Sequence, residues 1–181
     1  PARPPEVQEI NLKTGYAERL KISVPPNGHN EGHYVVKRHY AISGDGSRVP
    51  LTVVHHKDVT PDCDSPLLLT GYGAYGMSLT PGFSATRRTL LTRGVIHVTA
   101  HVRGGMENGY QWYRDGRMDN KDKSFDDFIG AAETLIRDGF TSAGNIVLHG
   151  GSAGGLLVGT TVMRRPELFK GAIADVPFVD V

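Results

Sequence analysis

The sequence has one cysteine, no long apolar run and almost no net charge. Cys63 has no second cysteine to pair with, so no internal disulfide can form, and we expect a reducing, cytoplasmic compartment. No apolar run approaches the roughly 20 residues that a membrane helix needs. Lys and Arg number 20 against 19 Asp and Glu, a net charge of +1, which favours neither nucleic acid nor an anionic membrane as partner.

The sequence does contain enough apolar material for a packed core. Hydrophobic residues make up 39% of the 181 residues and charged residues 22%, which excludes a disordered or collagen-like chain. Residues 1–33 are rich in proline and polar residues and predict short strands and turns. Segments 34–42 and 49–55 are rich in β-branched residues and are joined by a turn at 43–47, which predicts a hairpin.

After Pro66 strand-like and helix-like segments alternate. Ser124, followed by Asp127, resembles a capping box at the start of one helix, and Gly139 marks its end. The predicted strands are 67–69, 95–100, 146–148 and 169–174, and the predicted helices are 84–93, 124–138 and 154–164. This alternation predicts an α/β fold with a parallel sheet covered on both faces.

The strongest local signal is Gly150-Gly151-Ser152-Ala153-Gly154, a match to G-x-S-x-G. It lies directly between a predicted strand and a predicted helix, which is the setting of a nucleophile elbow. Ser152 would be the nucleophile, and the N–H of Ala153 at the helix start would bind a developing oxyanion. The alternative is a glycine-rich turn around a structural or phosphate-binding serine.

A second glycine-rich loop, Gly71-Tyr72-Gly73-Ala74-Tyr75-Gly76, matches the dinucleotide-binding pattern G-x-G-x-x-G. Two observations oppose that interpretation. Pro81-Gly82 interrupts where a helix should continue, and no acidic residue ends the next strand. The Tyr72 hydroxyl could instead donate to an oxyanion, or Tyr72 could simply pack the loop; spacing alone does not separate these two.

A serine nucleophile needs a base, and all eight histidines precede Ser152. In this fold class the acid and then the histidine follow the serine. We interpret His149 as a packing residue, and Asp175 and Asp180 as loop or cap residues. We therefore expect the chain to be an internal fragment, inactive by itself, whose base and acid lie beyond Val181.

Five motifs together resemble the prolyl oligopeptidase family of serine peptidases, in particular its oligopeptidase B subgroup. The motifs are 71–76, 102–109, Trp112, 150–155 and 165–169, and segment 174–181 is similar to that subgroup too. They occur in the order that the family shows, and the resemblance covers about residues 34–181.

This resemblance implies a seven-bladed β-propeller joined to an α/β-hydrolase catalytic domain. Residues 1–40 would be the end of the propeller and the crossover segment, and 41–181 the N-terminal, incomplete part of the α/β-hydrolase domain. Ser152 matches the nucleophile, and Tyr72 matches a tyrosine that donates to the oxyanion together with the Ala153 N–H. The subgroup cleaves short peptides after Arg or Lys and needs no metal or organic cofactor.

Other classes remain open from the sequence. One is a related hydrolase of the same superfamily, such as an esterase, a dipeptidyl peptidase or an acylaminoacyl peptidase. Another is a binding module that keeps the fold without catalysis.

Overall fold

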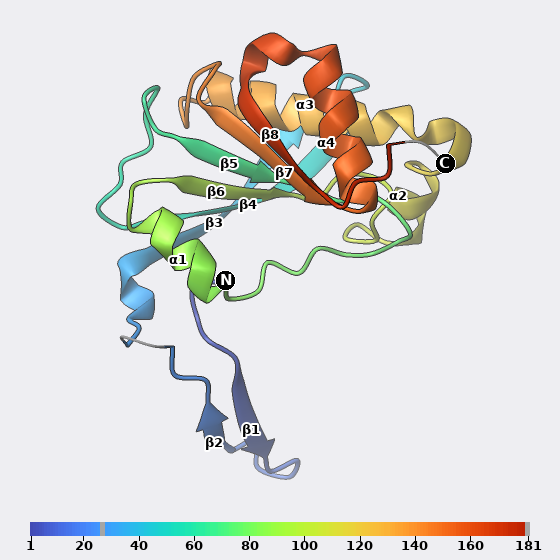
Figure 1. Ribbon diagram of the computed structural model, residues 1–181. Coiled ribbons are helices and arrows are strands. Elements are labelled where there is room, and N and C mark those ends of the chain that lie inside the picture. The colour runs from blue at the N-terminus through green and yellow to red at the C-terminus, as the bar shows by residue number, and fades with distance from the viewer. Residues whose placement is uncertain (26–27, 180–181) are drawn as a thin grey trace.

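Six strands form the sheet that positions the site, in the order β3-β4-β6-β5-β7-β8 (Figure 1). The computed structural model describes residues 1–25 and 28–179. The strands are β3 Tyr34–Ile42, β4 Arg48–His56, β5 Leu67–Thr70, β6 Ile96–Ala100, β7 Ile146–Gly151 and β8 Phe169–Asp175. Strands β5 to β8 are parallel, and the β3–β4 hairpin is added antiparallel to β6. The carboxyl ends of the parallel strands therefore share one edge, where ligands bind in open α/β sheets.

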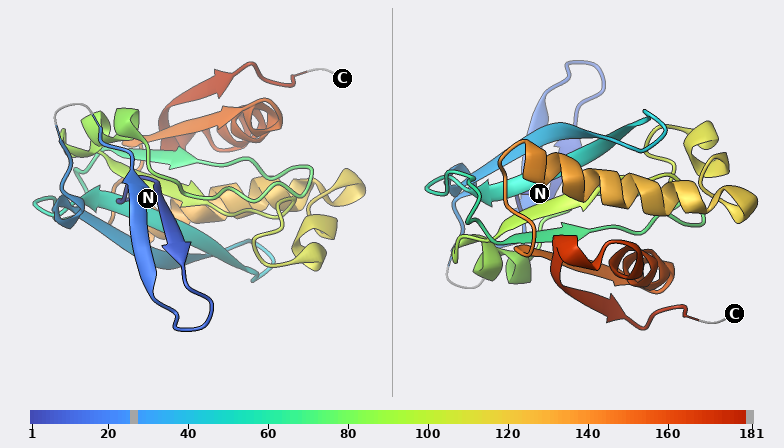
Figure 2. Two further views of the ribbon diagram at one scale, coloured as in Figure 1. Left: turned by 90° about the horizontal axis from the view of Figure 1, so that it is seen from below. Right: turned by 90° about the horizontal axis from the view of Figure 1, so that it is seen from above.

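Helices cover the two faces unequally. They are α1 Ala85–Leu91, α2 Tyr110–Arg114, α3 Asp122–Arg137 and α4 Ala153–Arg164, with the 3₁₀ turns η1 Glu31–His33, η2 Met118–Asn120 and η3 Pro166–Leu168. Helices α3 and α4 pack side by side on one face (Figure 2, right). The opposite face carries α1, so Leu68 and Val147 stay half-buried there, and the predicted covering of both faces is complete on one face only. No helix in the described ranges is long and apolar enough to cross a membrane.

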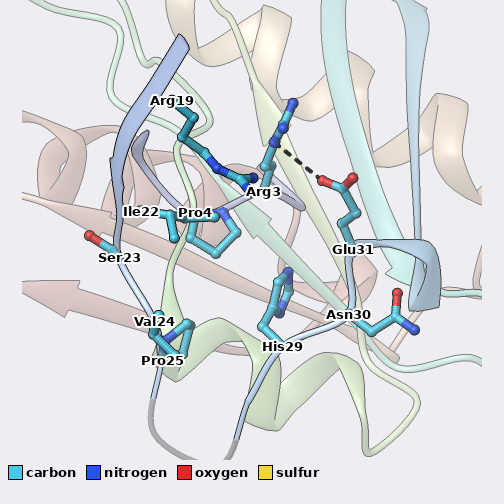
Figure 3. Close-up of a pocket in the computed structure, with 10 residues that line it drawn as sticks. All are labelled: Arg3, Pro4, Arg19, Ile22, Ser23, Val24, Pro25, His29, Asn30 and Glu31. Carbon is cyan, nitrogen blue, oxygen red and sulfur yellow. Dashed lines mark ion pairs between the residues drawn. The ribbon is translucent and has the colours of Figure 1, made fainter. Parts of the chain in front are cut away.

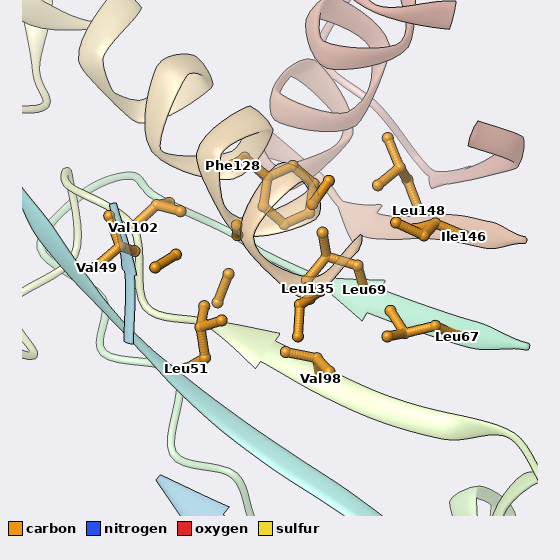
Figure 4. Packing of buried hydrophobic residues seen from close by; sticks show 14 of the residues in the cluster. Val49, Leu51, Leu67, Leu69, Val98, Val102, Phe128, Leu135, Ile146 and Leu148 are labelled. Atoms are coloured by element: carbon orange, nitrogen blue, oxygen red, sulfur yellow. The ribbon is translucent and has the colours of Figure 1, made fainter. Parts of the chain in front are cut away.

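The core lies between the sheet and α3 (Figure 4). Phe128 and Leu135 of α3 are fully buried, as are Leu69 and Val98 in the strands beneath. Burying a side chain of this size contributes about 1.5–3 kcal/mol. Because α3 precedes the parallel strand β7 and lies antiparallel to it, its first turn is held at the carboxyl edge of the sheet.

The N-terminal residues form a separate hairpin that extends away from the sheet (Figure 1). It consists of β1 Glu6–Ile10 and β2 Ala17–Ile22. The predicted boundary after residue 40 needs correction, because it falls inside β3. That strand pairs with β4 without a break from Tyr34 to Ile42, so the sheet-forming part begins at Tyr34.

The segment between Arg103 and Lys123, predicted as a loop, contains α2 and η2. The prediction that Ser124 caps the next helix is wrong. Helix α3 begins at Asp122, with Lys121 at the N-cap position. Ser124 is fully buried inside the first turn, and its hydroxyl donates to Arg103 O at 2.7 Å and Gly116 O at 3.1 Å. The Ser-x-x-Asp pattern therefore marks a buried polar contact with the preceding loop.

Candidate active site

Ser152 lies on the turn between β7 and α4 in a strained backbone conformation. Its φ of 54° and ψ of −119° are sparsely populated by residues with a side chain. The flanking glycines are required by close backbone contacts. A Cβ atom on Gly150 would lie 2.3 Å from Gly154 O, and one on Gly154 would lie 2.8 Å from Gly71 O. The turn therefore has the geometry of a nucleophile elbow.

The segment after β8 holds the Ser152 backbone from both sides. The N–H of Ser152 donates to Asp175 O at 2.8 Å, and the N–H of Phe178 donates to Ser152 O at 3.1 Å. Between them, a Cβ atom on Gly155 would lie 2.5 Å from Pro177 Cβ, so this segment packs directly on the first turn of α4. These contacts fix the strained serine in place.

The structure brings Tyr72 and Ala153 to the same turn. Ala153 is the first residue of α4, and the N–H groups of a first helical turn have no intrahelical partner and attract negative charge. The Tyr72 ring packs beside this turn, since a Cβ atom on Gly154 would lie 3.3 Å from Tyr72 Cδ2. The predicted nucleophile and both predicted oxyanion donors thus lie at or beside one turn, and their chemical roles stay predictions.

A cavity of about 590 Å³ opens beside the elbow. Its lining residues are Ala74, Tyr75, Tyr113, Gly116, Arg117, Met118, Lys121, Ala153, Leu156, Phe178 and Val179. Tyr75 and Met118 have positive φ angles of 55° and 50°, like Ser152. Backbone strain of this kind clusters at functional sites because the surrounding structure must hold it. The sequence analysis missed Met118 and Lys121, which lie between α2 and α3 where no periodic pattern marks them.

The cavity is positive on the side of α3. Arg117 and Lys121 both line it, and no carboxylate is among the described residues that do. Burial lowers the pKa of Lys121 to about 8. The cavity itself therefore offers two cationic groups and an otherwise mostly apolar wall.

A buried ionic network supports the loops under the elbow. Arg103 Nε lies 2.9 Å from Asp127 Oδ2, and Arg103 Nη1 lies 2.6 Å from Asp45 Oδ2. The hydrogen bond from Arg103 holds the pKa of Asp45 well below its usual range. Burial by itself would lower the pKa of Arg103, but the hydrogen bonds and charges of Asp127 and Asp45 outweigh burial, so the pKa of Arg103 is raised. The loop that Arg103 anchors accepts a hydrogen bond from the glycine loop, from Gly76 N to Gly104 O at 2.9 Å.

The histidine expectations need partial correction. His149 lies in the inner strand β7 as expected, but it is half-buried and its Nε2 lies 2.9 Å from Asp175 Oδ2, so it has a polar partner beside any packing role. Asp175 is the last residue of β8, not part of a loop, and Asp180 lies outside the described residues. Burial lowers the pKa of His97 to about 3, so it stays neutral at physiological pH. Within the described ranges, no histidine forms a hydrogen bond with the Ser152 hydroxyl, and no cluster of His, Cys, Asp or Glu could hold a metal ion.

A second cavity, of about 440 Å³, lies between the β1–β2 hairpin and η1 (Figure 3). Arg3 and Glu31 form an ion pair at 3.5 Å on its wall. The N–H at His29 Nε2 donates to Ala2 O at 2.6 Å. None of the described residues that line this cavity belongs to β7 or α4, so we assign it no part in the chemistry of Ser152.

The fold and the elbow together define a class. A serine on a strained strand-to-helix turn, at the carboxyl edge of a mostly parallel sheet and beside a helix N-terminus, is the nucleophile arrangement of α/β-hydrolases.

Comparison with known proteins identifies the family. Residues 81–181 match the model of the prolyl oligopeptidase family, so the chain belongs to that family of serine peptidases. Dipeptidyl aminopeptidase BI of Pseudoxanthomonas mexicana is 43% identical over 179 residues, which is 98% of this chain and 25% of that protein. Protease 2 of Moraxella lacunata is 41% identical over 172 residues, which is 95% of this chain and 25% of that protein.

A solved structure shows the same fold. Oligopeptidase B from Leishmania major superposes with a TM-score of 0.94 and 39% identity, covering 99% of this chain and 25% of that one. The chain thus spans about a quarter of the length of the relatives that it matches.

Proposed function

We propose that the protein is a serine oligopeptidase that hydrolyses short peptides through an acyl-enzyme on Ser152. The observation that carries the proposal is the strained Ser152 at the start of α4, held between Asp175 and Phe178 beside a cavity. Family membership and the packing of Tyr72 on the same turn support it.

The proposed reaction has two acyl-transfer steps. The Ser152 oxygen bonds to the substrate carbonyl carbon as its proton passes to a histidine base from outside these 181 residues. The Tyr72 hydroxyl and the Ala153 N–H stabilise the tetrahedral oxyanion. The C–N bond then breaks, and the leaving amine takes the proton. Water, deprotonated by the same base, releases the acid and restores the serine.

We propose Arg or Lys at P1, the substrate residue before the cleaved bond, because the sequence resembles the oligopeptidase B subgroup. The cavity beside Ser152 would receive that side chain. Its described lining contains no carboxylate, so the groups that bind a basic side chain would come from elsewhere in the protein.

Cleavage after an uncharged residue is the second candidate. The observation that favours it is the presence of Arg117 and Lys121 in the cavity lining, since like charges repel a basic side chain. Measuring kcat/KM of the complete gene product on matched Arg, Pro and dipeptidyl amides decides between the candidates. A preference for the Arg amide supports cleavage after basic residues. A preference for the Pro amide supports cleavage after an uncharged residue, and a preference for the dipeptidyl amide supports a dipeptidyl peptidase.

The nucleophile has a direct test in the complete gene product. Ser152→Ala removes the attacking oxygen, so we expect labelling by a fluorophosphonate probe to disappear. Ser78→Ala changes an exposed serine and should leave labelling intact. Labelling that persists in Ser152→Ala would exclude Ser152 as the nucleophile.

A further inference from the structure

Lys121 has an unusual environment for a lysine. It is half-buried at the N-cap of α3, although lysine side chains usually remain in water. Its ammonium donates to Gly73 O and lies 3.4 Å from Ser124 Oγ and 5.7 Å from the centre of the Phe125 ring. The ammonium of Lys121 is therefore partly removed from water, and its main hydrogen-bond acceptor is the carbonyl of Gly73 in the glycine loop.

Gly73 follows Tyr72 directly, so its carbonyl belongs to the backbone that carries the tyrosine. A Cβ atom on Gly73 would lie 2.6 Å from Val102 Cγ2, and one on Gly104 would lie 2.0 Å from Gly73 O. The loop is therefore clamped on one side by the 102–104 segment. A buried carbonyl needs a donor, and Lys121 is the donor to Gly73 O found within the described ranges.

The other end of this contact is rigid. Lys121 starts the helix whose buried side chains Ser124 and Asp127 bind the Arg103 loop. The ammonium thus connects the glycine loop to a helix that buried polar contacts join to the Arg103 loop.

We infer that Lys121 is a positioning residue for oxyanion stabilisation: by holding Gly73 O, it fixes the backbone from which Tyr72 reaches the reacting carbonyl. This inference rests on the proposed function. It assigns Lys121 no contact with the substrate's reacting atoms.

No carboxylate stabilises the charge of Lys121 among the described groups that share its cavity. The titratable or charged groups there are Tyr75 of the glycine loop, Tyr113 of α2 and Arg117 after α2. Because burial lowers the pKa of Lys121 to about 8, its ammonium loses its proton at moderately alkaline pH.

The first experiment compares Lys121→Met with Lys123→Met in the complete gene product. Lys123 lies in the same turn of α3, and no hydrogen bond or ion pair of its side chain is found in the described ranges. On a substrate with an uncharged P1 side chain, we expect Lys121→Met to lower kcat about 10- to 100-fold with KM within about threefold, because a small displacement of a transition-state donor acts on rate. Lys123→Met should match the wild type; equal kcat in both variants overturns the inference.

A double-mutant cycle shows whether Lys121 acts through Tyr72. In a Tyr72→Phe background, Lys121→Met should cost far less than in the wild type, because the hydroxyl to be positioned is already gone. Additive losses would mean that Lys121 acts elsewhere, and the inference fails. If Ser152→Ala keeps activity or wild-type protein is not labelled, the proposed function fails instead, so the two failures are distinct.

The pH profile supplies a readout that a merely structural lysine would not give. Because the neutral amine donates a weaker hydrogen bond to Gly73 O than the ammonium does, wild-type kcat should decline as pH rises through about 8. Lys121→Arg, which stays charged, should move that decline to higher pH. The Lys121 contribution to stability should rise over the same range, because the unfolded chain keeps this proton longer than the folded one. Should Lys121→Met fail to fold, an unmoved alkaline limb in Lys121→Arg still overturns the inference.

Discussion

At the scale of single residues, the site depends on a serine in an unfavourable conformation. A non-glycine residue in such a region costs about 1–3 kcal/mol. Two backbone hydrogen bonds, from Ser152 N to Asp175 O and from Phe178 N to Ser152 O, hold it there. The tight turn places the half-buried Ser152 at the carboxyl edge of the sheet, and the glycines around it remove the side chains that would block the turn.

Tyr72→Phe tests the proposed oxyanion hydroxyl. Losing one such donor costs about 2.7–4 kcal/mol in the transition state, so we expect kcat to fall about 10²- to 10³-fold with little change in KM. Steady-state kinetics of the complete gene product checks this. Tyr110→Phe removes a hydroxyl from an exposed ring and should have no effect. An unchanged kcat in Tyr72→Phe would leave this tyrosine a packing role only.

At the scale of elements, α3 is attached to the sheet by apolar packing and to the loops by charge. Asp127 is fully buried, and the Arg103 side chain is only 4% exposed. Such a pair is expensive to desolvate, but removing Asp127 leaves the buried Arg103 charge with only the partly exposed Asp45 as a carboxylate partner. The network therefore fixes where the Arg103 loop and the glycine loop above it can lie.

Asp127→Asn should destabilise the protein by about 3–5 kcal/mol because the Arg103 charge loses its buried partner. Asp126→Asn, one position away, removes an exposed carboxylate 3.4 Å from Arg164 and should cost about 0–1 kcal/mol. Denaturant unfolding measures both. Similar midpoints for the two variants would show that the buried pair contributes little.

The same elements show what the sequence could predict. The strand, glycine turn and helix around Ser152 were predictable because turn chemistry and periodicity are both local there. Ser124 and Asp127 were misread because a capping box and a buried contact use the same residue types at the same spacing. Met118 and Lys121 could not be predicted as cavity residues, since their position depends on how a non-periodic loop folds back on the glycine loop.

At the scale of the whole molecule, β3 and β8 are the two edge strands of the six-stranded sheet. Strand β3 exposes Lys37 and Arg38 in its middle, whereas β8 has its exposed charges, Lys170 and Asp175, near its ends and carries Ile173, which is 48% exposed, between them. Charged edge residues discourage pairing between molecules, and apolar ones do not. We propose, from the family resemblance, that the hairpin before this sheet is the end of a propeller.

The 181-residue chain on its own should self-associate through β8. Ile173→Lys places a charge on that edge and should lower the concentration-dependent light scattering of the purified chain. Val179→Lys makes the same change at an exposed apolar residue outside any strand and should have a smaller effect. If both variants lowered the light scattering equally, the added charge and not the position on the β8 edge would explain the effect.

The stretch from Asp175 to Phe178 serves two tasks with four residues. The backbone groups of Asp175 and Phe178 form hydrogen bonds with the backbone of Ser152, and the Phe178 side chain lines the cavity that would receive a substrate side chain. The contact with Ser152 is made by the backbone N–H of Phe178, which a substitution of the ring leaves in place. Variants at Phe178 should therefore change the cavity wall, and with it the preferred peptide, while both hydrogen bonds that hold Ser152 remain.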